Sequence, residues 1–134
     1  MNANNNKLNW IHVDESKFDT LPEAPAIYLI VVDTINNNYL VIYSGQTENI
    51  KDRAKQHWSE SEQNKKLKNI IKKYRTSVSL FYYQDDKSLM DGHEKYLFDR
   101  FEPQLQEKAP DVETIEIELP NNVVKGKLNK RYFE

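Results

Sequence analysis

The sequence predicts a small α/β protein with a mainly antiparallel three-stranded sheet flanked by helices, and with extra short strands near the termini. Two apolar runs of strand character, 26–33 and 39–44, are followed by three segments in which apolar residues recur at helical spacing. A further strand-like run separates the second helical segment from the third. This order, β-β-α-α-β-α, is typical of an antiparallel sheet covered by helices. With 134 residues, 38% of them hydrophobic, the chain is long enough for one domain with a single core.

The first part of the chain contains a tail and a short strand before the main sheet begins. Residues 1–6, rich in asparagine, have the composition of a disordered tail, and residues 9–13 are predicted to form a short strand. A loop bounded by prolines at 21–25 leads into the first long strand, 26–33. The whole segment 1–20 is therefore interpreted as an extension in front of the main domain.

The two long strands are predicted to form a hairpin. Residues 35–38 form its turn, because asparagine tolerates a positive φ at low cost. The second strand, 39–44, ends at Gly45, where a side chain would be awkward in the turn from strand to helix. The apolar alternation of this strand is incomplete, which indicates that both of its faces are covered.

Three helices and two more strands are predicted after the hairpin. Thr47 is a good N-cap for the first helix, at 48–58. The other predicted elements are a helix at 64–75, a strand at 76–84, a helix at 88–101 capped by Ser88 or Asp86, and a half-exposed strand at 113–119. Residues 108–134, including a basic tail from Lys125, are assigned to the same domain.

Composition excludes several classes of protein and site. The chain has no cysteine, which excludes disulfides, thiolate zinc sites and cysteine nucleophiles, and fits a reducing compartment. The longest apolar run is far too short for a membrane span, and the N-terminus lacks the features of a signal peptide. The sequence therefore predicts a cytoplasmic protein with no membrane partner.

Charge is unevenly distributed along the chain although its net value is only −2. Residues 51–75 carry a local charge of +6, residues 85–119 carry −7, and the last fifteen residues carry +3. Two solvated helix surfaces would account for this pattern. The alternative is a nucleic-acid surface that grips phosphate through the lysines of the second helix, Lys65, Lys66, Lys68, Lys72 and Lys73.

One carboxylate lies on the apolar face of the third helix. At about 100° per residue, Met90, Leu97 and Phe101 fall on one stripe, and Glu94 lies on that stripe as well. An unpaired buried carboxylate costs several kcal/mol, roughly, so Glu94 needs a metal or a cationic partner such as Arg53. A salt bridge, a rotated helix that exposes the carboxylate, and a metal site all remain open on periodicity alone.

Four other residues indicate a function only when they are considered together. Taken singly, Tyr28 and Tyr43 are typical core aromatics of strands, Arg53 is a typical surface charge, and His57 is a typical packed or capping histidine. Together with Glu94 they would supply hydroxyls, a guanidinium, an imidazole and an acid, which suits the cleavage of a phosphodiester.

Two short motifs on the long strands resemble those of the GIY-YIG nuclease family. The family's namesake motifs lie on neighbouring strands, and here they correspond to Ala26-Ile27-Tyr28 and Tyr43-Ser44-Gly45. The similarity covers about residues 21–107. Each three-residue motif is a weak signal by itself, whereas their order and spacing are fairly specific.

The helices carry the rest of the resemblance. Arg53 and His57 follow the second motif as on the family's arginine helix, and Glu94, with Pro103 after it, is similar to the family's metal-binding glutamate. The resemblance implies that residues 21–107 are a nuclease domain that cleaves DNA with one divalent metal, Mg²⁺ or Mn²⁺, held by Glu94.

The resemblance also implies roles for the other residues. Tyr28 or Tyr43 would accept a proton from the attacking water, and Tyr43 is preferred because it is nearer in sequence to the arginine helix. A tyrosine with a pKa near 10 is a poor base unless a nearby cation lowers that pKa, as Arg53 or the metal would. Arg53 would stabilise the transition state through its planar donors, and His57 would support it or relay a proton.

Three departures from the family pattern keep an inactive binding module, for nucleic acid or for a protein, open as an alternative. Ala26 replaces the family's glycine, Gln46 stands where some members carry lysine, and the late asparagine after the proline is absent. Gln104 or Gln106 would have to substitute for that asparagine. Specificity would come from the domain itself, from a homodimer, or from a separate partner protein.

Overall fold

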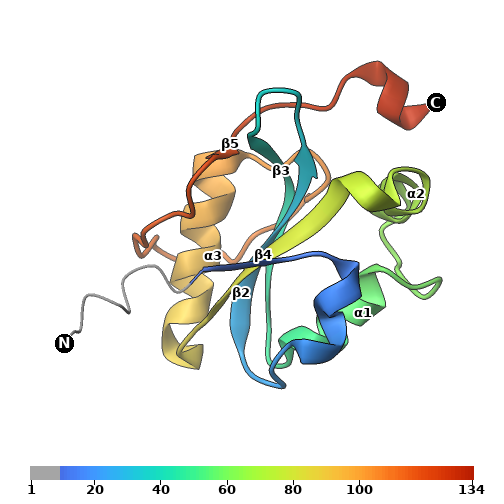
Figure 1. The fold of residues 1–134 in the computed structure, drawn as a ribbon. Helices are drawn as coiled ribbons and strands as arrows, with labels where there is room; N and C mark the ends of the chain where they lie inside the picture. Colours follow the sequence, from blue (N-terminus) through green and yellow to red (C-terminus); the bar gives the residue numbers. More distant parts are fainter. Residues whose placement is uncertain (1–9) are drawn as a thin grey trace.

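A five-stranded sheet forms the centre of the protein, with strands in the order β1-β4-β2-β3-β5 (Figure 1). The computed structural model describes residues 10–134, so the predicted tail at 1–6 and the first residue of the predicted strand at 9–13 lie outside it. The strands are β1 (Ile11–Val13), β2 (Ala26–Asp33), β3 (Tyr39–Thr47), β4 (Val78–Gln84) and β5 (Val123–Val124). All neighbours pair antiparallel except β3 and β5, which are parallel. The predicted α/β class is confirmed.

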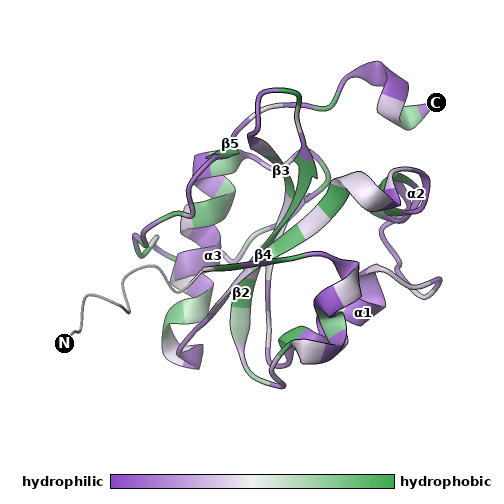
Figure 2. Cartoon of the chain, viewed as in Figure 1, coloured by the Kyte–Doolittle hydropathy of each residue, from purple (hydrophilic) through white to green (hydrophobic). Residues whose placement is uncertain are grey.

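Helices cover both faces of this sheet. The α-helices are α1 (Ile50–His57), α2 (Lys65–Lys73) and α3 (Lys87–Phe101), and the 3₁₀ helices are η2 (Glu15–Thr20), η3 (Arg75–Ser77) and η4 (Lys130–Phe133). In Figure 1, α3 lies on one side of the sheet, and α1 and α2 lie on the other. Figure 2 shows hydrophobic residues concentrated along the strands, and hydrophilic residues on the outer side of α2.

The alternation of β2 explains this two-sided packing. Tyr28 and Ile30 point into the cluster formed with α1 and α2, whereas Ile27 and Leu29 point into the cluster formed with α3. Each of these four side chains is almost completely buried. Burial of apolar surface on both faces is the main stabilising contribution available to a domain of this size.

The hairpin of β2 and β3 sets the register of the functional residues. Asn37 takes a positive φ of 62° in the turn, as predicted. Tyr28 of β2 lies directly opposite Gly45 of β3. Tyr43 lies opposite Ile30 in the same register, which puts it on the same face as Tyr28; the pairing shifts only beyond this point, between Ile30 and Val31, which indicates a bulge.

The predicted start of the first helix is wrong. Strand β3 continues through Thr47, two residues past Gly45, and the helix begins at Ile50. Asn49 is the N-cap, because its side chain accepts a hydrogen bond from the backbone of Asp52 at 3.1 Å. Thr47 instead supports the loop by accepting a hydrogen bond from the backbone of Asn49. Of the two caps considered for the third helix, Asp86 is the one that the structure uses.

The predicted strand at 113–119 is also wrong. Its backbone lies against helix α3, where the amide of Ile115 donates to the carbonyl of Gly92 at 3.0 Å. The ring of Trp10 donates to the carbonyl of Glu118 at 2.7 Å. Ile117 and Leu119 pack on the same apolar cluster as α3. The alternation of the segment therefore reflects packing on a helix, and the C-terminal strand of the sheet is β5 instead.

Candidate functional site

Three of the predicted site residues meet through one buried hydroxyl. The Oη atom of Tyr28 lies 2.8 Å from Nε2 of His57, and Nε of Arg53 donates to the same Oη at 3.3 Å. Tyr28 is 1% exposed and His57 is equally buried. Helix α1 positions both partners, because Arg53 and His57 are four residues apart and therefore lie on one face.

A residue that the sequence analysis missed completes this chain of hydrogen bonds. Glu62 is buried in the loop after α1, and its carboxylate lies 3.1 Å from Nδ1 of His57. A carboxylate accepts hydrogen bonds, so Nδ1 carries the proton and Nε2 is free to accept from Tyr28. Burial lowers the pKa of His57, which keeps the ring neutral, although the hydrogen bond to Glu62 opposes this. Burial pushes the pKa of Glu62 upward, but His57, Arg53 and the backbone of Asn64 together outweigh it, so the net pKa is lowered.

Replacing Glu62 with glutamine should release the tautomer of His57. Glutamine has the same shape, but its amide can also donate to Nδ1, which would turn Nε2 into a donor facing Tyr28. Hydrogen bonds to charged groups contribute about 1.5–3 kcal/mol, so we expect any activity of this site to fall roughly ten- to a hundredfold. Nitrogen NMR of the His57 ring should show a single Nδ1–H tautomer in the native protein and a mixture in Glu62→Gln.

The matched control for this variant is Glu60→Gln. Glu60 lies two residues away on the same loop, is exposed, and contacts Lys68 at 3.4 Å rather than His57. An unchanged His57 tautomer in Glu62→Gln, or an equal change in Glu60→Gln, would contradict the positioning role of Glu62.

Tyr43 borders the same cluster but is open to solvent. Its ring centre lies 6.3 Å from that of Tyr28 and 5.2 Å from that of His57. It lines a hollow of about 440 Å³ together with Arg53 and Glu62. Of the two tyrosines, Tyr43 is thus the one that water in this hollow can reach.

We expected Arg53 to lower the pKa values of the two tyrosines, but in the metal-free protein the net pKa of each tyrosine is raised. Burial raises the pKa of Tyr28 above its usual value of 10, and burial also raises the pKa of Tyr43. Arg53 lowers both values, but by less than burial raises them. Neither tyrosine is therefore ionised at neutral pH in the metal-free protein.

Glu94 is buried on α3, as its place on the apolar stripe predicts. Its side chain is 8% exposed, and it makes no ion pair among the described residues, which sets aside the salt-bridge alternative. The side-chain amide of Gln106 donates to Oε2 of Glu94 at 3.1 Å. Burial raises the pKa of the Glu94 carboxyl, and the neighbouring amides of Gln46 and Gln106 only partly offset this.

Gln106, rather than Gln104, reaches the site. Its Oε1 accepts from the backbone of Ser44 at 2.9 Å and from the Ser44 hydroxyl at 2.5 Å. Its Nε2 donates to Glu94 and to the carbonyl of Lys108. Gln104 accepts from the backbone of Leu128 instead and has no hydrogen bond to Glu94 or Ser44. Through these hydrogen bonds, Gln106 links the Glu94 carboxylate to Ser44, the residue that follows Tyr43.

The donor set fits a hard divalent cation. Mg²⁺ is commonly held by one or two carboxylates, with water and phosphate oxygens supplying the remaining ligands. Glu94 offers such a carboxylate without a cationic neighbour to neutralise it. Within residues 10–134 no group of three or more His, Asp or Glu side chains is placed to hold a metal ion, so water and phosphate oxygens would have to complete the coordination of a cation at Glu94.

The lysines of α2 divide into three groups. Lys65 and Lys66 line a groove of about 550 Å³ that also includes Tyr43. Lys68 turns back to the carbonyl of Glu60 at 2.8 Å. Lys72 and Lys73 are exposed further along the helix, where they face the C-terminal helix η4. The structure therefore places two of the five predicted phosphate contacts beside the tyrosine cluster.

The comparisons with known proteins agree with this geometry. The family model of the GIY-YIG catalytic domain matches residues 24–108, well over half of the chain. A search of curated proteins and a search of solved structures each found no match. Every helix in the described part of the chain is too short or too polar to cross a membrane.

Proposed function

Because this chain belongs to the GIY-YIG family, we propose that it is a metal-dependent endonuclease that hydrolyses DNA phosphodiester bonds. The family's catalytic domain implies nuclease-type activity and is generally dependent on a divalent metal. The observation that carries the proposal is Glu94, a buried carboxylate with no cationic partner within residues 10–134, joined through Gln106 to the strand that bears Tyr43. A purely structural acid at this position would be costly without a partner.

Each residue of the cluster has a role in this proposal. Glu94 holds Mg²⁺ or Mn²⁺, which when bound polarises the phosphate and stabilises the leaving oxygen. Arg53 donates to the phosphate oxygens, since its Nε and Nη1 atoms are held by Tyr28 and Gln56 while Nη2 has no acceptor among the described residues. Tyr43 would accept the proton of the attacking water as a phenolate, because it is the tyrosine that water can reach; since burial raises its pKa, the bound metal together with Arg53 would have to lower that pKa first.

The buried hydroxyl of Tyr28 offers a second route for the proton of the attacking water. His57 is neutral, and its Nε2 accepts a hydrogen bond from the Tyr28 hydroxyl. If Tyr28 takes a proton from water, it can therefore give its own hydroxyl proton to His57. Glu62 stabilises the imidazolium that would result. Tyr28 is therefore the alternative base, with an outlet for its proton but little access to water.

DNA is the proposed partner, and the α2 lysines are its proposed phosphate contacts. Lys65 and Lys66 lie in the groove beside Tyr43, which suits the strand that is cut. Affinity should fall with rising salt, because phosphate contacts release counterions.

A cleavage assay tests the function directly. Supercoiled and branched DNA should be cut in Mg²⁺ or Mn²⁺ and left intact in EDTA. Arg53→Ala should reduce the rate about a hundred- to a thousandfold, the usual cost of removing one donor to a developing negative charge. Lys55→Ala is the matched control, since Lys55 lies on the same helix but is exposed and pairs with Asp19 at 2.5 Å.

The outcomes separate the nuclease from an inactive binding module. No cutting of any substrate by the folded native protein, together with salt-dependent DNA binding, would favour the module. The first positions to restore to the family pattern would then be Ala26 and Gln46. The side-chain amide of Gln46 donates to Asp91 at 2.5 Å.

A further inference from the structure

Three hollows follow one another across the surface that bears Tyr43. The hollow at Arg53 shares Tyr43 and Asn64 with the groove beside Lys65. That groove in turn shares Lys66 with a third hollow, of about 570 Å³, between α2 and η4. A flexible chain that leaves the Arg53 site thus has a continuous path along α2 to the C-terminal helix.

The third hollow has an aromatic wall and an apolar floor. Tyr132 packs on Tyr74 with ring centres 4.6 Å apart, and Ile70 forms part of the floor. Phe133 is 40% exposed, and Nζ of Lys66 lies 6.0 Å from its ring centre. An exposed ring next to a cation offers a flat surface for another π system.

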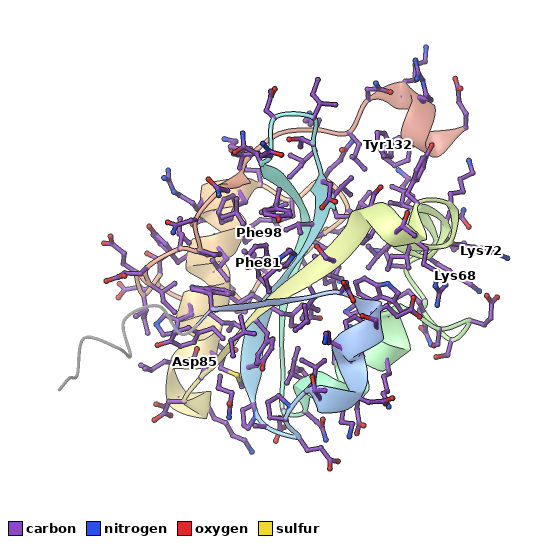
Figure 3. The ribbon with its side chains drawn as sticks, viewed as in Figure 1. Lys68, Lys72, Phe81, Asp85, Phe98 and Tyr132 are labelled. Carbon is purple, nitrogen blue, oxygen red and sulfur yellow. The ribbon has the colours of Figure 1, made fainter. Side chains whose placement is uncertain are left out.

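The rim of this hollow is strongly basic. Lys66, Lys72 and Lys73 of α2 line it, and Glu134 is the one acid in the lining. Lys130 and Arg131 are exposed and precede Tyr132 directly in the chain. Figure 3 shows Lys68, Lys72 and Tyr132 on the side of the molecule away from Phe98 of helix α3. A partner for this surface must be negatively charged and must also present flat apolar groups.

We propose that this surface, the α2–η4 platform (Lys66, Lys72, Lys73, Tyr132 and Phe133), binds single-stranded nucleic acid, with a base stacked on Phe133 and phosphates at the lysines. The proposal rests on the nuclease function above and names its substrate class as DNA with an unpaired strand next to the cut. Bases in a duplex already stack on one another, so only an unpaired strand can offer a base to the ring. Residues 130–134 lie outside the family match at 24–108, so the aromatic part of the platform, Tyr132 and Phe133, is a feature of this chain's own C-terminal segment.

Binding in EDTA tests the platform separately from cleavage. Fluorescence anisotropy would compare labelled single-stranded oligothymidine with a labelled duplex, using the full chain. Phe133→Leu keeps an apolar side chain but removes the ring, so single-strand affinity should fall about five- to tenfold, while duplex affinity should change less than about twofold.

Phe98→Leu provides the matched control. Phe98 also lies under a lysine, with Nζ of Lys95 6.0 Å from its ring centre, but it belongs to helix α3, away from the platform, and the three basic and three acidic residues of that helix cancel. Its replacement should leave both affinities unchanged. Thermal unfolding of the two variants would verify that each is folded.

Several results would overturn the platform. Native single-strand affinity in Phe133→Leu would do so, and so would an equal loss for the duplex, because stacking would then contribute nothing specific. Tighter binding of polyglutamate than of oligothymidine would assign the surface to an acidic protein instead. If Phe133→Leu binds single strands like the native protein while the native protein cuts DNA, only the platform is refuted. If Phe133→Leu loses single-strand affinity but the native protein cuts no DNA, only the nuclease is refuted.

Discussion

Replacing Glu94 with glutamine should abolish metal-dependent cleavage and at the same time raise the thermal stability of the metal-free protein. Glutamine keeps an oxygen that accepts from Gln106, but it removes the charge that would hold the cation. Loss of metal assistance costs several kcal/mol in such reactions, so the rate should fall at least about a hundredfold. The gain in stability follows from burial, because the native carboxylate has no cation to compensate it.

The raised pKa of Glu94 determines how the stability difference between the native protein and Glu94→Gln changes with pH. Burial raises the pKa of Glu94 above its usual value of 4.5, so the folded protein holds this proton more tightly than the unfolded chain does. Below pH 4.5 the group is protonated in both states and has no effect. As the pH rises through 4.5 and then through the higher folded pKa, Glu94 progressively destabilises the native protein. The advantage of Glu94→Gln in EDTA should therefore be full at pH 8 and vanish toward pH 4.

Melting temperatures with EDTA and with Mg²⁺ would measure both parts of the prediction. Mg²⁺ should stabilise the native protein and leave Glu94→Gln unchanged, since only the native carboxylate binds it. Asp99→Asn is the control, because Asp99 also lies on α3 but is exposed and pairs with Lys95 at 2.8 Å. A Glu94→Gln protein that still cuts DNA, or that melts below the native protein in EDTA at pH 8, would refute the assignment.

Local signals in the sequence were sufficient for most of the fold. Strand β2 occupies the predicted residues 26–33, because a long apolar run that is buried on both faces leaves little choice of boundaries. The segment 113–119 shows the limit of such signals. Its alternation is genuine, but the backbone lies against a helix, and a period of two does not reveal which partner covers the apolar side.

The candidate site was partly predictable for a related reason. Glu94 was found from helical periodicity, since a charge on an apolar stripe conflicts with its neighbours. Glu62 offers no such conflict, because it lies in an irregular loop among polar residues and becomes buried only through its contact with His57. The choice between Gln104 and Gln106 likewise depended on the path of the loop after α3, which sequence spacing does not determine.

Gly45→Ala should damage both the fold and the site, and it is the second large effect that we expect. A Cβ atom at Gly45 would lie 2.6 Å from Oη and 2.7 Å from Cζ of Tyr28, which is closer than real Cβ atoms approach. The backbone of Gly45 has no positive φ, so the glycine is required by the close approach of the tyrosine and not by conformation. Tyr28 has little room to retreat, because it is buried and its hydroxyl is tied to His57 and Arg53.

Overpacking of this kind costs about 1–3 kcal/mol of folding free energy. Displacement of the Tyr28 hydroxyl should raise the activation free energy of cleavage by a similar amount, which lowers the rate roughly ten- to a hundredfold. Urea unfolding and cleavage rates of Gly45→Ala would measure both. Gly126→Ala is the control, because its Cβ would meet only the end of the flexible Leu40 side chain, at 2.9 Å.

A double-mutant cycle with Tyr28→Phe separates the steric effect of Gly45→Ala from any effect on the strand itself. Tyr28→Phe removes the 2.6 Å contact and the hydrogen bonds that hold the ring, so that the ring, with Cζ at 2.7 Å, can move away from the new Cβ; the two substitutions together should therefore destabilise the protein less than the sum of their separate effects. Strict additivity would mean that the hydroxyl and Gly45 do not compete for the same space. The glycine of the second motif would then be needed for β3 alone, and its place opposite Tyr28 would have no bearing on the chemistry.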